Sequence, residues 1–145
     1  MAVAVKKVTL WRVEVENEPG TLDSVLAPLA AAGVDLQVVM GYRQSGHASE
    51  AVVEACPVSG KKAMTAAREV GLSPSSIPTL LVEGDNKPGL GHAIAQALAE
   101  AGMNLGFLVA QVVGKKFSAV IGFDDEAQSR KAVNLIKKAA QRAGK

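Results

Sequence analysis

The sequence predicts an α+β protein of two ferredoxin-like βαββαβ units, each an antiparallel sheet with helices on one face. Two observations lead to this prediction. The segment ENEPG at residues 16–20 returns as DNKPG at residues 85–89, and flanking residues repeat at the same offset of 69 positions. Each copy also shows the same succession of patterns, which is strand, helix, strand, strand, helix. We therefore expect one unit over residues 1–73 and a second over residues 74–145.

A strand and a helix open each copy. Apolar and polar residues alternate from Thr9 to Glu16, as is typical of a half-buried strand. The Asn-x-Pro-Gly segment then ends the strand, and apolar residues at helical spacing follow until Gly33 in the first copy and Gly102 in the second. The apolar positions of these two predicted helices are Leu22, Val25, Leu26 and Leu29, and Leu90, Ile94, Leu98 and Ala101.

A hairpin and a second helix complete each copy. Two β-prone runs flank a short turn containing glycine, first at Gln44 to His47 and again at Gly114 to Lys116. A helix with alanine and aliphatic residues on one face follows each hairpin. The predicted strands cover residues 36–43, 48–56, 105–113 and 117–123, and the predicted helices cover residues 61–70 and 125–143.

The fourth strand that each βαββαβ unit needs is not clearly marked in the sequence. Residues 72–83 must form the last strand of the first unit, the first strand of the second unit, or both in one continuous run. After the helix predicted at residues 125–143 no segment is left to close the second sheet. How the sheet of the second unit is completed therefore stays open.

Composition narrows the class of protein. The chain has 145 residues, 48% of them hydrophobic and 3% aromatic, with a net charge of +2. No uncharged run approaches the roughly 18 apolar residues of a membrane-spanning helix, and Lys6 and Lys7 come too early for a secretory segment. The single cysteine, Cys56, excludes an intramolecular disulfide and a cysteine-built metal site. We expect a cytoplasmic protein with no membrane partner, no metal and no cofactor.

The basic character of the sequence is local. From Asp124 onward the chain has six basic and three acidic residues, and the rest of the chain carries a net charge of −1. Acidic residues at the start and basic residues at the end of a helix complement its dipole. This segment also has no aromatic residue for stacking on bases. We therefore expect no nucleic-acid partner.

The repeated segment resembles the ACT domain family. The resemblance rests on Asn-x-Pro-Gly after a strand, on a helix that closes at Ala-Gly, and on Val-Asp-Leu or Met-Asn-Leu opening the next strand. It spans Glu16 to Leu36 in the first copy and Asp85 to Leu105 in the second. The resemblance implies a regulatory module that binds a small ligand, typically an amino acid, where two such domains meet. The arrangement is similar to tandem ACT proteins without a catalytic domain, although the missing final strand departs from that pattern.

The candidate ligand-binding residues lie where the first strand of each copy turns into its helix. A glycine there lets a ligand approach the unpaired N–H groups of the first helical turn, which together with the helix dipole favour a carboxylate. Asn17 and Asn86 add an amide, and Thr21 adds a hydroxyl. An alternative is that these residues are turn and capping residues only. The candidates are Asn17, Pro19, Gly20, Thr21 and Leu22, and Asn86, Pro88, Gly89, Leu90, Gly91 and His92.

The functional prediction is a non-catalytic regulatory protein that senses an amino acid, or a similar small carboxylate, at the interface between ACT-like units. No spacing typical of a catalytic triad, a histidine metal site or a phosphate-binding loop is present, so we name no catalytic residue. The alternative is a structural or oligomerisation module without a ligand. Because apolar residues occupy both alternate sets of positions in the second hairpin, we expect another subunit to cover it, as in a homodimer.

Overall fold

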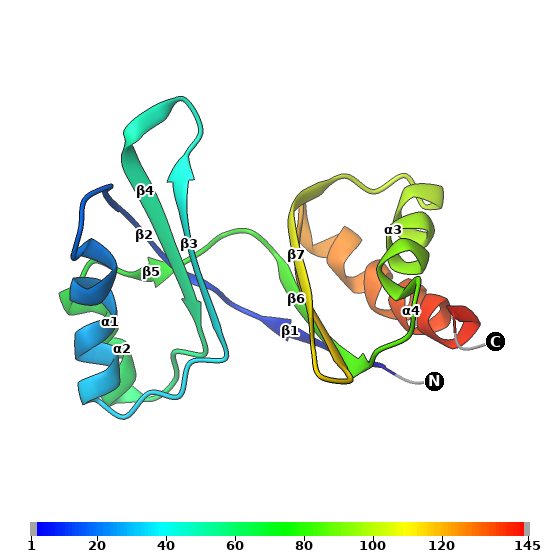
Figure 1. Ribbon diagram of the computed structural model, residues 1–145, viewed down its shortest axis with the longest axis horizontal. Coiled ribbons are helices and arrows are strands. Elements are labelled where there is room, and N and C mark those ends of the chain that lie inside the picture. Colours follow the sequence, from blue (N-terminus) through cyan, green and yellow to red (C-terminus); the bar gives the residue numbers. More distant parts are fainter. Residues whose placement is uncertain (1–2, 144–145) are drawn as a thin grey trace. The chain divides into compact units, whose positions relative to one another are not determined.

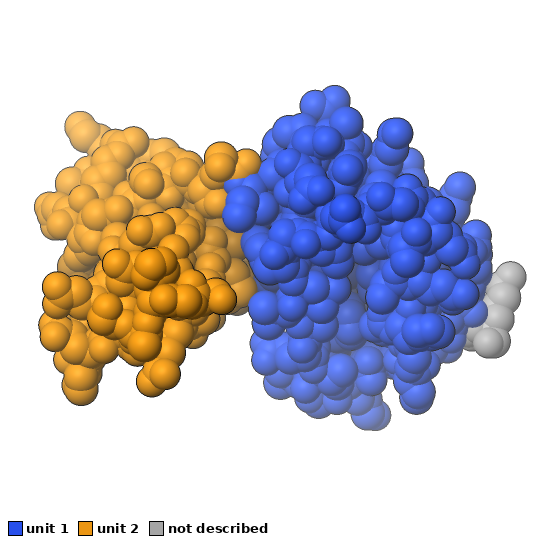
Figure 2. All heavy atoms as spheres, turned by 90° about the horizontal axis from the view of Figure 1, so that it is seen from above, with its two compact units in different colours: residues 1–8, 77–145 blue, residues 9–76 orange. Residues whose placement is uncertain are grey.

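The computed structural model describes residues 3–143, and the chain forms two compact units (Figures 1 and 2). Unit 2 consists of residues 9–76, and unit 1 combines residues 1–8 with residues 77–145. Each unit contains one four-stranded antiparallel sheet and two helices. The predicted tandem ferredoxin-like architecture is confirmed.

Unit 2 follows the predicted order of elements. Its sheet has the strand order β3-β4-β2-β5. The apolar residues that alternate along β2 pack with the helices on one face of this sheet, and Trp11, Leu29 and Val53 are buried there. The elements are β2 (Trp11–Glu16), α1 (Thr21–Ala31), β3 (Val38–Gln44), β4 (His47–Cys56), α2 (Lys61–Glu69) and β5 (Ser73–Pro74).

Unit 1 repeats this topology, with the strand order β1-β6-β8-β7. Its core lies between the sheet and the two helices, where Val82, Ile94, Ile121 and Ile136 are buried. The elements are β1 (Val3–Val8), β6 (Thr79–Asp85), α3 (Leu90–Glu100), β7 (Leu105–Val113), β8 (Lys116–Phe123) and α4 (Glu126–Ala143).

The strand that sequence analysis could not find for this sheet is β1. It pairs antiparallel with β6, from Val3 opposite Gly84 to Val8 opposite Thr79, and so takes the place that β5 has beside β2 in unit 2. Val3 is 7% exposed and belongs to the core of unit 1. Each of the two sheets therefore has four strands.

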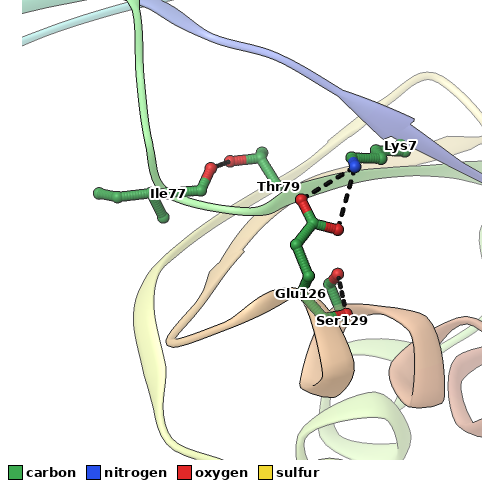
Figure 3. A network of polar contacts seen from close by, with 5 residues as sticks. All are labelled: Lys7, Ile77, Thr79, Glu126 and Ser129. Carbon is green, nitrogen blue, oxygen red and sulfur yellow. Dashed lines mark hydrogen bonds and ion pairs between the residues drawn. The ribbon is translucent and has the colours of Figure 1, made fainter.

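A polar contact also links β1 to the last helix of unit 1 (Figure 3). The ammonium of Lys7 lies 2.9 and 3.0 Å from the two carboxylate oxygens of Glu126, in the first turn of α4. In the same turn the hydroxyl of Ser129 donates to the carbonyl of Glu126 at 2.9 Å. Lys7 and Glu126 are both largely exposed, so the apolar packing of β1 contributes more than this ion pair.

The units differ from the expected division into residues 1–73 and 74–145. Residues 1–8 belong with residues 77–145, because β1 hydrogen-bonds to β6. Within residues 72–83 the chain forms two separate strands, β5 as the last strand of unit 2 and β6 as the first β-strand after it. The other predicted strands and helices lie within two residues of their expected bounds.

Candidate functional site

The first candidate site is the Gly20 turn, which comprises residues 16–21 between β2 and α1. The backbone N–H of Asn17 donates to the carbonyl of Ser49 at 2.8 Å, and its side-chain amide donates to the carbonyl of Ala48 at 3.2 Å. The N–H of Thr21 donates to the carbonyl of Glu18 at 3.3 Å. The Asn17 side chain therefore ties the turn to the β3–β4 hairpin rather than capping the helix.

The second candidate site is the Gly89 turn, which comprises residues 85–90 between β6 and α3. The N–H of Asn86 donates to the carbonyl of Lys115 at 2.8 Å, which ties this turn to the β7–β8 hairpin. The N–H of Leu90 donates to the carbonyl of Lys87 at 3.1 Å. The two turns thus have the same backbone geometry, as their shared sequence pattern predicts.

Both glycines have a left-handed backbone. The φ angles are +90° at Gly20 and +85° at Gly89, a conformation that costs any residue with a Cβ about 1–2 kcal/mol. A Cβ placed on either glycine would meet no atom within 4 Å. Each glycine is also the N-cap residue of its helix, so it offers no side-chain acceptor to the first-turn N–H groups. Both turns are therefore open to a molecule that approaches the helix end.

The remaining candidates lie around these glycines with different exposure. In the Gly20 turn Thr21 is partly exposed and Leu22 is 45% exposed. In the second copy Leu90 is only 3% exposed and belongs to the core of unit 1, so its side chain has a packing role. The other candidates are partly exposed at Asn86 and exposed at Asn17, Pro19, Gly20, Pro88, Gly89, Gly91 and His92.

The two helix starts differ in charge and bulk. The first turn of α1 carries the carboxylate of Asp23, which would repel an anionic ligand, and the bulky Leu22. The corresponding positions of α3 are His92 and Gly91, and a Cβ on Gly91 would also meet no atom within 4 Å. The electrostatics of the Gly89 turn therefore suit a carboxylate better than those of the Gly20 turn.

A polar cluster that the sequence patterns did not predict lies on the strands of unit 2. Glu54 of β4 is 2% exposed, and its Oε2 accepts a hydrogen bond of 2.9 Å from the hydroxyl of Tyr42. Its Oε1 has no hydrogen-bond partner among residues 3–143. Arg12 is the cross-strand neighbour of Glu54 and lies 3.1 Å from Glu14. A lone glutamate in the apolar run Val52 to Cys56 was the signal that could have indicated this cluster.

The cluster shifts two pKa values. Burial raises the pKa of Tyr42, the hydrogen bond to Glu54 raises it further, and Arg12 opposes both. Partial burial lowers the pKa of Arg12, but its hydrogen bonds with Glu14 and Tyr42 outweigh the burial, and the net pKa is raised. The neutral phenol and the positive guanidinium are therefore the favoured forms.

Residues 3–143 contain neither a metal centre nor a membrane-spanning helix. That part of the chain has no group of three or more His, Cys, Asp or Glu side chains placed to hold a metal ion. None of its helices is both long enough and apolar enough to span a membrane. One surface pocket of about 490 Å³ lies at the start of α2, lined in part by Asp35, Ser59 and Lys62. None of the residues that line it belongs to either glycine turn.

The fold is similar to that of several solved structures. Protein BT0572 from Bacteroides thetaiotaomicron superposes with a TM-score of 0.72 at 15% identity, over 90% of this chain and 88% of that one. The regulatory subunit of aspartate kinase from Thermus thermophilus, in its ligand-free form, has a TM-score of 0.65 at 16% identity, over 96% and 97%. The regulatory subunit from Thermus flavus has a TM-score of 0.61 at 15% identity, over 100% and 98%. No family model and no curated protein matches the sequence.

At these identities the similarity establishes the fold. The chain has the tandem βαββαβ architecture that the resemblance to the ACT domain family implies, and the match extends over nearly the full length of each of these chains. The order of elements, the two sheets and the two glycine turns thus agree with that resemblance.

Proposed function

We propose that this chain is a non-catalytic regulatory protein that binds an amino acid, or a similar small carboxylate, at the glycine turns of its ACT-like units. The observation that carries the proposal is the pair of open helix N-termini at Gly20 and Gly89, each capped by a left-handed glycine. The proposal is also supported by the similarity of the fold to the regulatory subunits of aspartate kinase from two organisms.

The chemistry of the turns favours a carboxylate. The N–H groups at the start of a helix have no partner within the helix, and the helix dipole adds a partial positive charge there. At Gly89 the carboxylate would meet the first-turn N–H groups of Gly91 and His92. The imidazole of His92, which is exposed, would add favourable charge when protonated.

We assign the stronger site to the Gly89 turn. Asp23 places a negative charge in the first turn of α1, whereas α3 has no acidic residue in its first turn. Because the turns are open on the side of the missing Cβ, a ligand there is enclosed only when a second ACT-like unit covers it. A ligand that prefers the covered arrangement would shift the population toward it, which is the regulatory signal.

A thermal-shift screen against the standard amino acids at millimolar concentration tests the proposal. A ligand present at a hundredfold its Kd stabilises the native state by about 2.7 kcal/mol, which raises the Tm by several degrees. We expect at least one amino acid to do so. We also expect Gly89→Ala to abolish most of that rise, because its Cβ would occupy the space that the carboxylate needs.

Gly102→Ala is the matched control. Gly102 has a φ of +73° beyond the end of α3, and a Cβ there would also meet no atom within 4 Å. Both substitutions carry the same backbone strain of about 1–2 kcal/mol, so both lower the Tm of the free protein. Only Gly89→Ala is expected to lose the response to ligand. An equal response in the two variants would contradict the site, and no response of the parent protein to any amino acid would favour the alternative, an oligomerisation module without a ligand.

A further inference from the structure

The exposed side of helix α4 carries more positive charge than the fold of unit 1 uses. The helix packs against α3 and the sheet of unit 1 through a buried row that includes Ala132, Ile136 and Ala140 (Figure 1). The opposite side is exposed along the whole helix, and we call it the basic face of α4. Its residues are Ala127, Arg130, Lys131, Asn134, Lys137, Lys138, Gln141 and Arg142, of which five are basic and none is acidic.

The helix dipole accounts for only one of these five charges. The dipole favours a cation within the last turn of a helix, and among the five only Arg142 lies there. Arg130 and Lys131 lie in the second turn, near the positive end of the dipole, where a cation gains nothing from it. Lys138 and Arg142 are four residues apart, a spacing at which like charges repel each other. The stability of α4 therefore does not explain the charge of its basic face.

Ion pairs do not use this charge either. None of the five basic side chains pairs with a carboxylate of residues 3–143. Glu126 precedes Arg130 by four residues, which is a suitable spacing for a pair, but its carboxylate lies 2.9 and 3.0 Å from the ammonium of Lys7 (Figure 3). The basic face is thus available to the negative charges of a partner.

The charges of the basic face form a regular pattern. At about 100° per residue, its eight residues fall within an arc of about 140° around the helix. An uncharged row runs along the middle of this arc, and a basic row runs on each side of it. The uncharged row is Ala127, Asn134 and Gln141, one basic row is Arg130 and Lys137, and the other is Lys131, Lys138 and Arg142. Charges in each row repeat after seven residues, a distance of about 10.5 Å along the axis.

We propose that the basic face of α4 binds an acidic helix of another protein, independently of any ligand at the glycine turns. A helix that lies along the uncharged row repeats its own side chains at the same seven-residue distance, so carboxylates on its two flanks meet both basic rows. Flanking charges of this kind select the partner in paired helices. Each of the four helices among residues 3–143 contains a single acidic residue, so a second copy of this chain does not supply the pattern.

Other polyanionic surfaces fit the basic face less well. A nucleic acid would carry its phosphates past the start of α4, where the carboxylates of Asp124, Asp125 and Glu126 would repel them. A membrane surface requires large apolar side chains beside the charges. The uncharged row has only an alanine and two amides. A protein helix can end before the three acidic residues or place a basic residue beside them, so it is the partner that the charges favour.

Fluorescence anisotropy with a designed peptide tests the proposal. The probe is a fluorescein-labelled, alanine-based helix of about 21 residues with two adjacent glutamates in every seven, which places carboxylates along both of its flanks. The control peptide has the same composition, with the glutamates distributed evenly around the helix. At low ionic strength we expect the parent protein to bind the probe at least about fivefold more tightly than the control peptide, because only the probe matches both basic rows.

Charge reversal on α4 locates the binding surface. The double variant Lys131→Glu with Lys138→Glu reverses one basic row at exposed positions, and its far-UV CD spectrum should be unchanged. One exposed ion pair contributes a factor of up to about five in affinity, so we expect the Kd for the probe to rise at least about tenfold. The double variant Lys61→Glu with Lys62→Glu is the matched control, because it changes the net charge equally at exposed positions of α2. Its Kd should stay within about twofold of the parent value.

Four results would overturn the proposal. They are no binding of the probe by the parent protein, equal affinity for the two peptides, equal weakening by the two double variants, and tighter binding of double-stranded DNA or of phosphatidylserine vesicles than of the probe under the same conditions. The last result would instead assign the basic face to a nucleic acid or to a membrane surface.

Discussion

Val3→Ala is the most direct test of how β1 is used, because chain order and tertiary structure assign this residue to different units. Chain order places Val3 with residues 9–76, whereas the structure buries it in the core of unit 1 with Val82 and Ile94. The substitution removes two buried methyl groups, each contributing about 0.8 kcal/mol. We therefore expect the free energy of unfolding of unit 1 to fall by about 1.6 kcal/mol.

Hydrogen exchange measured by mass spectrometry locates this loss. Since 1.4 kcal/mol corresponds to a factor of ten, the slowest amides of α3 should exchange roughly 14 times faster in Val3→Ala. Val53→Ala is the matched control: Val53 is 3% exposed in the core of unit 2, and its truncation should accelerate exchange in α1. Faster exchange confined to α1 in Val3→Ala, or unchanged exchange in α3, would refute the assignment of β1 to unit 1.

Two further predictions concern polar contacts. Tyr42→Phe removes the hydrogen bond to the buried carboxylate of Glu54. Denaturant unfolding at neutral pH should show that the free energy of unfolding falls by about 1 kcal/mol, below the roughly 1.5–3 kcal/mol of a hydrogen bond to a charged group, because Tyr42 is 46% exposed. Because the pKa of Tyr42 is raised in the folded protein, the contribution of Tyr42 to the free energy of unfolding is present below the ordinary tyrosine pKa and declines as the pH rises through the folded pKa. This decline should be missing from Tyr42→Phe. An equal decline in both proteins would contradict the raised pKa. The hydrogen bond from Lys116 and the charge of Lys116 lower the pKa of Asp85 in the folded protein. The contribution of this pair to stability is therefore present above the ordinary aspartate pKa and is lost as the pH falls through the folded pKa. An NMR titration should show the pKa of Asp85 rising toward its ordinary value in Lys116→Met, and no change would show that the exposed pair is screened.

The candidate site was predictable as far as local geometry decides it. The Asn-x-Pro-Gly pattern placed a glycine between strand and helix at the start of α1 and again at the start of α3, and the structure gives both glycines a left-handed backbone. The use of each side chain was not predictable. Leu90 is buried in the core, and the amide of Asn17 is bound to the neighbouring hairpin. Both depend on which segments pack nearby.

The polar cluster shows the same limit. The sequence places Glu54 in an apolar strand but contains no signal for its partner, because Tyr42 belongs to the neighbouring strand. The hydrogen bond between them follows from the pairing of β3 with β4, which brings Tyr42 opposite Val52 and diagonal to Glu54.

The sequence alone determined the number of units, the order strand, helix, strand, strand, helix within each, and the ends of the first helix in each copy. These features depend on periodicity and turn residues over short stretches, and the repeat at an offset of 69 residues confirmed each reading with a second copy. Only the tertiary structure decided which strand closes which sheet. The pairing of Val3 with Gly84 joins backbone groups that are far apart in the sequence. Any apolar strand of suitable length could form the hydrogen bonds that the open edge of the sheet offers. The choice of β1 therefore depends on the packing of its side chains against α4 and β6, which short-range sequence patterns do not encode.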